Sequence, residues 1–392
     1  GKGMFKIFPI SGGVCAAKGF YADGKNCGLK SEGYDLSFIR SASLCNVAGV
    51  FTKNKFCAAP VVDAKAKIEK PSHGIIINSK NANAMTGKRG LDDLDEILAH
   101  LPFENPFMSS TGVIGEFLPK EKIIKGISEF NFEAIDPENA SKAIMTTDKW
   151  EKSIALQVVL ENGEMFNIGA MAKGAGMIAP NMATMLCFVT TDAKVERDAL
   201  QNHLDNVVGS TFNAVTVDGD MSTNDSVFVF ANGESNAYEE AAFGEALRMV
   251  MHEMALQLVK DGEGATKLVA YEVKGAKNSE EAQTAAKALA NSLLVKTALF
   301  GQDPNWGRLA MAVGASGVTC DESSLIIQIG NVVLYDKGEN KMCTEVEEKA
   351  AKVMQSAEFR VTIDLGVGES IYRAYGCDLG HEYVTINADY RT

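Results

Sequence analysis

The segment with the clearest chemical potential is residues 173–185, which read Lys-Gly-Ala-Gly-Met-Ile-Ala-Pro-Asn-Met-Ala-Thr-Met. Pro180 lacks an N–H and biases Ala179 away from helical angles, while the glycines permit conformations closed to other residues, so an ordinary helix is excluded. Thr184 carries the only hydroxyl of this segment and follows a small residue, Ala183. A tight backbone here would let Thr Oγ attack the Ala183 carbonyl. The acyl group would move from N to O, and water would hydrolyse the ester.

That reaction would end one chain at Ala183 and start a second at Thr184 with a free α-amine. Because the reference pKa of an α-amine is about 7.7–8, this amine can take the proton from its own Oγ near neutral pH. A Thr with a terminal amine as base is an activated nucleophile. The expected pieces are residues 1–183 and 184–392. They would share one core, since residues 185–189 are predicted to form a buried strand. A structural role for Thr184 is the alternative.

Further blocks of unusual sequence are spread in order along the chain. They are residues 81–87 (Asn-Ala-Asn-Ala-Met-Thr-Gly), 110–115 (Ser-Thr-Gly-Val-Ile-Gly), 145–148 (Met-Thr-Thr-Asp), 218–225 (Asp-Gly-Asp-Met-Ser-Thr-Asn-Asp), 261–267 (Asp-Gly-Glu-Gly-Ala-Thr-Lys), 301–308 (Gly-Gln-Asp-Pro-Asn-Trp-Gly-Arg) and 387–392 (Asn-Ala-Asp-Tyr-Arg-Thr). Together with residues 173–191, they resemble the self-cleaving ornithine acetyltransferase (glutamate N-acetyltransferase) family of arginine biosynthesis. The resemblance covers nearly the whole chain. Lys80 and Met85 depart from it, since many relatives would have Gly and Cys there.

The expected elements are strands with hairpins and interleaved helices. Predicted strands are residues 74–78, 154–159, 186–190, 226–231, 268–273 and 325–329, with Asn162-Gly163 and Gly330-Asn331 as hairpin turns. Apolar spacing predicts helices near residues 91–101, 241–258 and 282–293, the last capped by Ser279. This mixture favours an α/β (α+β) layered fold. The resemblance implies a DmpA/ArgJ-like sandwich of mixed sheets with helices outside, superficially similar to the N-terminal-nucleophile hydrolases.

The resemblance also implies an activity. N-acetylornithine would acylate Thr184 and release ornithine, and glutamate would then take the acetyl group and leave as N-acetylglutamate, in a ping-pong cycle. Some family members also accept acetyl-CoA, and nothing in this sequence decides whether this chain does. The two pieces are expected to assemble with each other at least as α2β2.

Several residues take expected roles through the resemblance. Thr111 (hydroxyl) and Gly112 (backbone N–H) would form the oxyanion hole for the tetrahedral intermediate; a plain Ser/Thr-rich turn is the alternative. Lys173 is a compact cation that suits a substrate carboxylate. Glu263 can attract the ammonium of ornithine. The expected substrate contacts are Thr147, Lys173, Thr184, Glu263, Asn387 and Thr392.

Composition excludes several other classes. The net charge of −13 works against nucleic-acid binding, and the sequence has no apolar run long enough to span a membrane. We see no export signal and expect a cytoplasmic protein with free thiols. The eight Cys and five His show no zinc-ligand spacing, so no metal is expected.

No cofactor is expected either. Residues 174–179 match a dinucleotide fingerprint, but no clear strand leads into them and Pro180 blocks the helix that should follow. Cys187, three residues after Thr184, is interpreted as a buried structural thiol because its neighbours are apolar. Two other functions stay open: an amidase or aminopeptidase of the N-terminal-nucleophile type, in which water accepts the acyl group, and a metabolite-binding protein that never cleaves.

Overall fold

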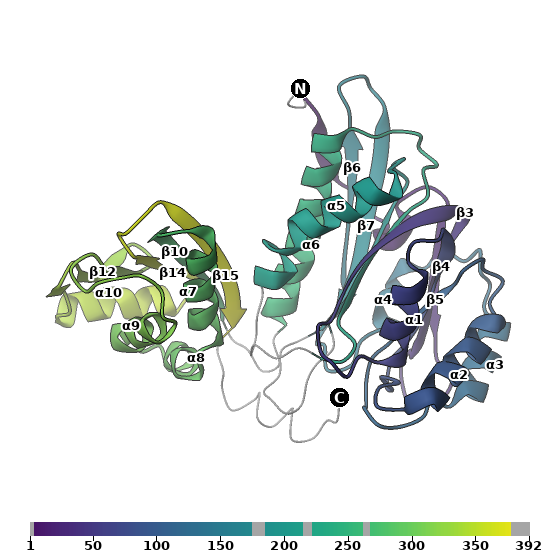
Figure 1. Cartoon of the computed structure of the whole chain (residues 1–392), viewed down its shortest axis with the longest axis horizontal. Helices are drawn as coiled ribbons and strands as arrows, with labels where there is room; N and C mark the ends of the chain where they lie inside the picture. Colours follow the sequence, from purple (N-terminus) through teal and green to yellow (C-terminus); the bar gives the residue numbers. More distant parts are fainter. Residues whose placement is uncertain (1–3, 175–184, 215–221, 262–266, 378–392) are drawn as a thin grey trace.

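The computed structural model describes residues 4–174, 185–214, 222–261 and 267–377. Two β-sheets, each with its own hydrophobic core, form two lobes that lie side by side (Figure 1). The larger lobe ends near Asp261 and the smaller lobe begins near Lys267. The predicted layered α/β fold with mixed sheets and outer helices is confirmed. The chain passes from one core to the other between α6 (Glu240–Lys260) and β10 (Leu268–Ala276), a boundary that was not predicted from the sequence.

Nine described strands build the sheet of the larger lobe. They are β1 (Lys6–Pro9), β2 (Phe20–Lys25), β3 (Leu36–Phe51), β4 (Ser72–Asn78), β5 (Phe107–Ser110), β6 (Lys152–Val159), β7 (Met165–Lys173), β8 (Leu186–Thr191) and β9 (Ser226–Ala231). Their order is β1-β6-β7-β8-β9-β3-β4-β5, with β2 also paired to β3. The 16-residue strand β3 pairs with β4 through residues 36–45 and with β9 through residues 46–51. One long strand therefore joins two halves of the sheet.

The two halves stack face to face. Ile75 and Phe107 of one half share a core with Phe188 and Phe228 of the other, and the rings of Phe107 and Phe228 lie 5.6 Å apart. Alternate residues of the same strands point outward because side chains in a strand alternate between faces. The outer faces are covered by α5 (Arg197–Val208) and α6 on one side and by α2 (Gly87–Ala99) and α3 (Lys120–Glu129) on the other. The result is a helix–sheet–sheet–helix sandwich.

The helices of the larger lobe lie outside this double sheet. Their bounds are α1 (Ala59–Lys67), α2 (Gly87–Ala99), α3 (Lys120–Glu129), α4 (Pro137–Ala143), α5 (Arg197–Val208) and α6 as above, with short 3-10 turns η1 (Gly13–Cys15) and η2 (Phe212–Ala214). The hydrophobic cluster beneath α5 and α6 contains side chains from both sides of position 184 in the sequence, among them Ile168 of β7 and Val189 of β8. The division of the chain at Ala183–Thr184 stays a prediction, because both residues lie outside the described part.

The smaller lobe is a six-stranded sheet with helices packed on it. Its remaining elements are β11 (Ile326–Ile329), β12 (Val332–Asp336), β13 (Glu339–Asn340), β14 (Glu358–Asp364), β15 (Ser370–Cys377), α7 (Ser279–Asn291), α8 (Leu293–Phe300), α9 (Trp306–Ala315) and α10 (Thr344–Met354). The strand order is β13-β12-β11-β14-β10-β15. Alanines of α7 and aliphatic side chains of β10, β11 and β14 fill its core.

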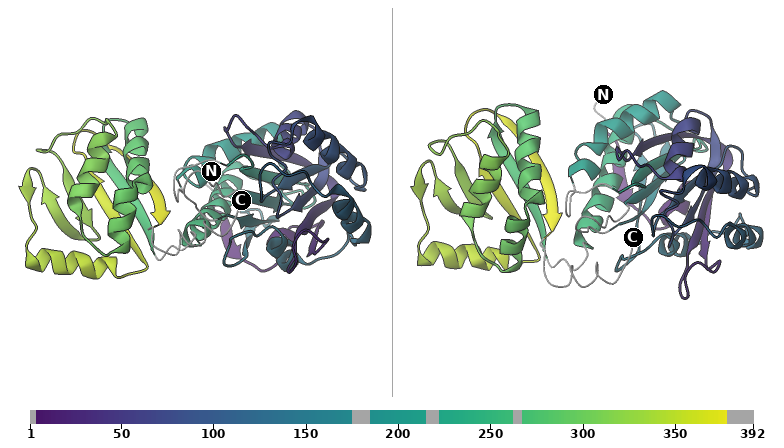
Figure 2. Two further views of the ribbon diagram at one scale, coloured as in Figure 1. Left: turned by 90° about the horizontal axis from the view of Figure 1, so that it is seen from below. Right: turned by 60° about the horizontal axis from the view of Figure 1, so that its bottom comes forward.

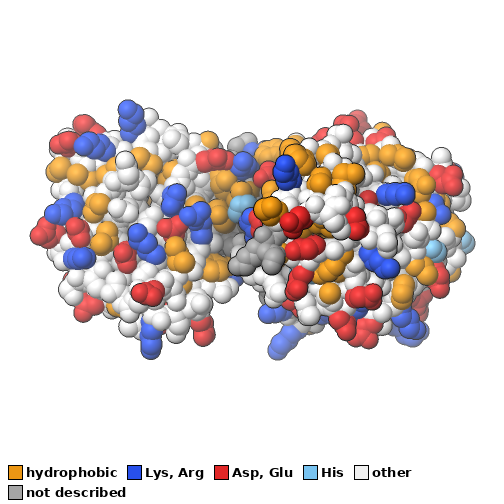
Figure 3. Space-filling model, turned by 90° about the horizontal axis from the view of Figure 1, so that it is seen from above, with side chains coloured by type: hydrophobic (Ala, Val, Ile, Leu, Met, Phe, Trp, Pro, Cys, Tyr) orange, Lys and Arg blue, Asp and Glu red, His pale blue; other side chains and the backbone are white. Residues whose placement is uncertain are grey.

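The contact between the lobes runs along α6 and β15 (Figure 2). Tyr372 donates a hydrogen bond from its hydroxyl to the carbonyl of Gly209 at 2.6 Å. His252 of α6 and Tyr375 of β15 stack edge to face with centroids 5.7 Å apart. The face in Figure 3 shows acidic and basic side chains interspersed over both lobes.

All six predicted strands are present, and both predicted hairpins turn where glycines adopt positive φ, 86° at Gly163 and 58° at Gly330. The predicted N-cap of α7, Ser279, was wrong. Asn278 caps that helix by accepting a hydrogen bond from Glu281 N at 2.8 Å, and Ser279 is its first residue. The predicted helix also divides, because Ser292 leaves helical angles and caps α8 instead.

Two further expectations concern the site region. The statement that no clear strand leads into Gly174 was wrong, since β7 ends at Lys173. Cys187 is fully buried in β8, and burial raises the pKa of its thiol, as expected for a structural residue. In the part of the chain that the structure describes, no helix is long and apolar enough to cross a membrane. The same residues hold no cluster of potential metal ligands.

Candidate active site

Four of the predicted site residues lie in the described part of the chain: Thr111, Gly112, Thr147 and Lys173. The other five lie outside it, namely Ala183, Thr184, Glu263, Asn387 and Thr392. The described residues that border the ranges containing them are Gly174, Met185, Asp261, Lys267 and Cys377. The geometry that follows therefore concerns the surroundings of the expected nucleophile.

Lys173 lies at the end of β7 with its side chain buried. Its ammonium donates to the hydroxyl of Thr111 at 3.1 Å and to that of Thr146 at 2.7 Å. Two predicted site residues, 62 positions apart in sequence, are thus in direct contact. Thr147, which is half-buried, was predicted to contact the substrate through its hydroxyl. Thr146 is the one that reaches Lys173, a contact that two adjacent threonines do not reveal in the sequence.

Thr111 and Gly112 form the turn that follows β5. The amide of Thr111 donates to the carbonyl of Asn78 at 3.0 Å, which continues the pairing of β5 with β4. Gly112 has a φ of 136°, and a Cβ at this position would lie 2.1 Å from the carbonyl carbon of Lys80. Only a residue without a side chain fits there. This close approach is the physical reason for glycine in the predicted oxyanion turn.

Lys80 and Met85, where the resemblance leads us to expect Gly and Cys, both have positive φ, and Lys80 lies against that turn. Their φ values are 79° and 56°, in the left-handed region where a side chain is strained. At residue 80 the expected Gly is the type that adopts this φ without strain.

A buried network of charges, not foreseen from the sequence, surrounds the base of the site. The ammonium of Lys152 lies 2.8 Å from an oxygen of Asp148 and 2.6 Å from an oxygen of Asp261, and all three side chains are buried. Asp148 also accepts a hydrogen bond from the amide of Gly174 at 2.9 Å. Both carboxylate oxygens of Asp261 share the single amide N–H of Lys149. The network holds the chain where residues 175–184 and 262–266 begin.

The two carboxyl groups respond differently to this environment. Burial opposes ionisation of Asp148, but the positive charges of Lys173 and Lys152 outweigh it and hold its pKa below the ordinary value. For Asp261, burial dominates over the attraction of Lys152, and its pKa is raised. Asp148 is therefore the firmly ionised partner, placed between two lysines.

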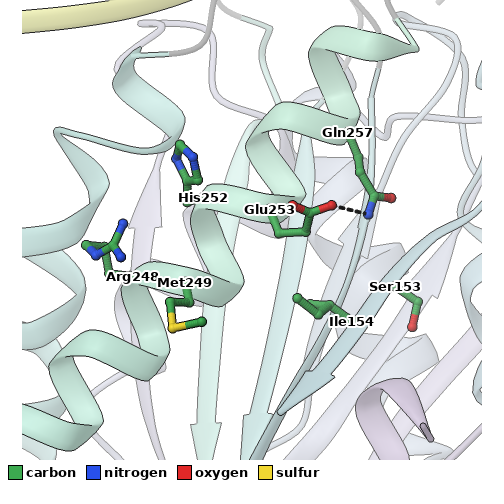
Figure 4. Close-up of a pocket in the computed structure, with 7 residues that line it drawn as sticks. All are labelled: Ser153, Ile154, Arg248, Met249, His252, Glu253 and Gln257. Atoms are coloured by element: carbon green, nitrogen blue, oxygen red, sulfur yellow. Dashed lines mark hydrogen bonds between the residues drawn. The ribbon is translucent and has the colours of Figure 1, made fainter. Parts of the chain in front are cut away.

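A hollow elsewhere on the larger lobe is formed by β6 and α6, with Arg248, His252 and Glu253 among its lining residues (Figure 4). Arg248 already makes a bidentate pair with Glu245 of the same helix. Glu253 accepts a hydrogen bond from Gln257 at 3.1 Å. None of the described residues that were predicted for the site lines this hollow, so it gives no support to the predicted chemistry.

A layered sandwich that brings a buried lysine against a glycine turn suits an acyl-transfer enzyme. Comparison with known proteins assigns the family. Residues 21–392 match the model of the ArgJ family, and the chain belongs to that family.

The relatives agree with this assignment. The chain is 52% identical to the arginine biosynthesis bifunctional protein ArgJ of Wolinella succinogenes over 99% of this chain and 100% of that protein. It is 44% identical to the glutamate N-acetyltransferase of Methanocaldococcus jannaschii over 98% and 99% of the two chains. The crystal structure of ArgJ from Bacillus halodurans has 39% sequence identity and a TM-score of 0.50, covering 55% of this chain and all of that one. This protein is accordingly an acyltransferase.

Proposed function

We propose that this protein is a self-processing enzyme of arginine biosynthesis that moves an acetyl group from N-acetylornithine to glutamate, with Thr184 as nucleophile. The observation that carries the proposal is the contact between Lys173 and Thr111. It joins the cation expected to hold a substrate carboxylate to the hydroxyl expected to stabilise the oxyanion. The names of the relatives, ArgJ and glutamate N-acetyltransferase, support the same reaction.

Self-cleavage would precede catalysis. Thr184 Oγ attacks the carbonyl carbon of Ala183, the C–N bond breaks, and the nitrogen leaves as the amine of Thr184 after gaining the proton that Oγ loses. Water then hydrolyses the ester, which gives Ala183 a carboxylate and restores the hydroxyl. The new amine can act as general base for its own Oγ.

The transfer would follow in two half-reactions. Oγ attacks the acetyl carbon of N-acetylornithine, and the proton taken up by the Thr184 amine passes to the leaving nitrogen of ornithine. The neutral α-amine of glutamate then attacks the acetyl ester, and its proton returns to Oγ as N-acetylglutamate leaves. Each half-reaction passes through a tetrahedral oxyanion, so preorganised donors lower both barriers.

Thr111 suits the role of such a donor. A hydroxyl that accepts a hydrogen bond from a lysine still has its own proton to donate, and Thr111 accepts one from Lys173. The Gly112 amide, in a turn that excludes a side chain, would be the second donor. We assign the remaining substrate contacts to Thr147, Glu263, Asn387 and Thr392.

The first experiment is the denatured mass of the purified protein before and after incubation with N-acetylornithine. We expect two pieces, the second beginning at Thr184, and an added acetyl group on that piece. Thr184→Ala should show neither cleavage nor acetylation, while Thr184→Ser, which keeps a hydroxyl, should retain some of both. A Thr184→Ala protein that still transfers acetyl groups would contradict the mechanism.

The acceptor decides between transferase and amidase. Acetyl release from the acylated enzyme should depend on glutamate; equal release in buffer alone would favour the amidase reading. Acetylation of Thr184 by acetyl-CoA would establish it as a second donor. The native mass of the processed protein would test the α2β2 assembly.

A further inference from the structure

Residues 222–225, directly before β9, link two parts of the candidate site that belong to different halves of the sheet. The carboxylate of Asp225 accepts a hydrogen bond at 2.8 Å from the amide of Met185, the residue that follows Thr184. Ser222 supports the same carboxylate through its hydroxyl at 2.6 Å and its amide at 3.2 Å. The amide of Ser226 also donates to the carbonyl of Met185 at 3.1 Å. The start of β8 is thus fastened at both the N–H and the C=O of Met185.

Asn224, the residue before Asp225, binds the half of the sheet that contains β5. Its amide nitrogen donates to the carbonyl of Ser110 at 2.8 Å and to that of Ala82 at 2.7 Å. Thr223 donates its hydroxyl to the Asn224 amide oxygen at 2.6 Å, which fixes the orientation of the amide group. The Ser110 carbonyl belongs to the peptide whose N–H is on Thr111. Asn224 therefore holds the end of β5 immediately before the oxyanion turn.

We propose that Asn224 and Asp225 are positioning residues that together set the distance between the nucleophile and the oxyanion hole. The inference rests on the proposed roles of Thr184, Thr111 and Gly112. We call residues 222–225 the bridge. Because Asn224 and Asp225 are adjacent in the chain, the hydrogen bonds of one side chain cannot move without moving those of the other. Misplacement of reacting groups by about 1 Å can lower a rate about 100-fold, and such precision requires supporting side chains that are themselves locked.

The bridge is itself buried and tied to its surroundings. Ser222, Thr223 and Asn224 are all buried. Thr52 donates from its hydroxyl to the Ser222 carbonyl at 2.7 Å and from its amide to the Asp225 carbonyl at 2.9 Å. The amide of Ala58 donates to the Thr223 carbonyl at 3.0 Å. These bonds come from the loop after β3, the strand that joins the two halves, so the bridge is anchored at the fold's own junction.

Asn224→Asp is the sharpest test, because it keeps size and shape but replaces the donor with an oxygen that faces two carbonyl oxygens. Activity is expressed per chain that begins at Thr184, counted by intact mass. We expect kcat for acetyl transfer to fall about 100-fold with KM nearly unchanged, since the substrate contacts are elsewhere. Asn331→Asp, the same change in the exposed turn between β11 and β12, is the matched control and should leave kcat unchanged.

Asp225→Ala and Asp225→Asn form the second test. The Asn variant keeps an acceptor for the Met185 amide, so it should recover part of the kcat that the Ala variant loses. Hydrogen exchange of the Met185 amide should accelerate in the Ala variant, while amides in β14 of the smaller lobe stay protected. This readout keeps the test informative if either variant cleaves poorly.

The outcomes separate the two proposals. If the native protein is active and Asn224→Asp keeps its kcat, the positioning role is wrong and the proposed function stands. If Asp225→Asn has a kcat as low as that of Asp225→Ala, the hydrogen bond from the Met185 amide to residue 225 does not carry the effect, and the positioning role is contradicted. If the native protein neither cleaves nor transfers an acyl group, the proposed function fails and the positioning role fails with it.

Discussion

The two lobes of this protein bury polar groups in different ways. In the larger lobe, buried polar side chains gather around the end of β7 and the turn after β5, among them Asn78, Ser110, Thr111, Lys152 and Lys173. The hydrophobic cluster of the smaller lobe is built from aliphatic, alanine and aromatic side chains. Many ion pairs of this lobe, such as Lys349 with Glu345, lie at the surface.

All four described residues of the candidate site lie in the larger lobe, among these buried polar groups. Burying a polar group costs free energy unless each donor and acceptor finds a partner, so a dense buried network persists where it is fully connected and useful. Lys267 and Lys296 are buried in the smaller lobe as well, which shows that one buried lysine does not mark a site. The convergence of several such groups on one turn does.

The largest expected effect comes from removing the cation of the buried network. Lys152→Met leaves the carboxylates of Asp148 and Asp261 buried without it, and should lower the free energy of unfolding by about 3–5 kcal/mol. Lys349→Met, at an exposed pair of the smaller lobe, should leave the urea midpoint unchanged. The chain has two Trp, Trp150 in the larger lobe and Trp306 in the smaller, so single-Trp variants report the unfolding of each lobe separately.

A triple variant sharpens that result. Adding Asp148→Asn and Asp261→Asn to Lys152→Met removes the two carboxylates that would be left without their cation. The free energy of unfolding should then be higher than that of Lys152→Met alone. Equal stability of the two variants would mean that the loss came from packing of the Lys152 side chain and not from its charge.

The second prediction compares two glycines with positive φ. Gly112→Ala adds a Cβ that would lie 2.1 Å from the Lys80 backbone, whereas Gly338 in the smaller lobe, φ 95°, has nothing within 4 Å of an added Cβ. Gly338→Ala should cost about 1–2 kcal/mol from backbone strain alone. Gly112→Ala should cost about 1–3 kcal/mol more from the close approach and abolish most of the acetyl transfer. Equal losses in thermal unfolding would contradict the close approach.

The third prediction concerns Lys30, whose ammonium donates to the Met145 carbonyl at 2.7 Å, one residue from Thr146. Burial lowers its pKa to about 8, Asp35 opposes the change, and the charge of Lys173 adds to it. The folded state therefore binds fewer protons than the unfolded state between about pH 8 and 10.5, the ordinary pKa of a lysine, and stability rises with pH across this window. Lys30→Met should remove that rise, measured as urea midpoints at closely spaced pH values against the native protein. An identical pH profile would show that Lys30 keeps an ordinary pKa.

The smallest expected effect is at Lys80. Lys80→Gly relieves about 1–2 kcal/mol of left-handed strain but adds about 0.5–1 kcal/mol of chain entropy, so a gain of up to about 1 kcal/mol is expected in thermal unfolding. Lys337→Gly, φ 48° in the smaller lobe, should give a similar gain, because this strain is local and independent of the site. A loss of stability at Lys80 alone would show that its side chain makes a needed contact.

The sequence by itself predicted six of the strands, both hairpin turns and the family. Strands such as β8 and β9 are continuous apolar runs because both faces are covered, and hairpin glycines mark turns that need positive φ. These signals are local, so a linear pattern carries them. The prediction of the α7 cap was wrong because Asn278 and Ser279 are both good N-cap residues. Residue type alone does not rank two such neighbours.

Only the tertiary structure decided which residues meet. Lys173 reaches Thr111 and Thr146, Lys152 reaches Asp261 across 109 positions, and Asn224 reaches Ser110 across 114. The contacts of Lys173 with Thr111 and of Asn224 with Ser110 depend on how one long strand, β3, stacks two halves of a sheet, and no spacing rule encodes that stacking. Side-chain chemistry is a property of the residue type. The distance between two chemical groups is a property of the packed fold, because burial and hydrogen bonding across layers set it.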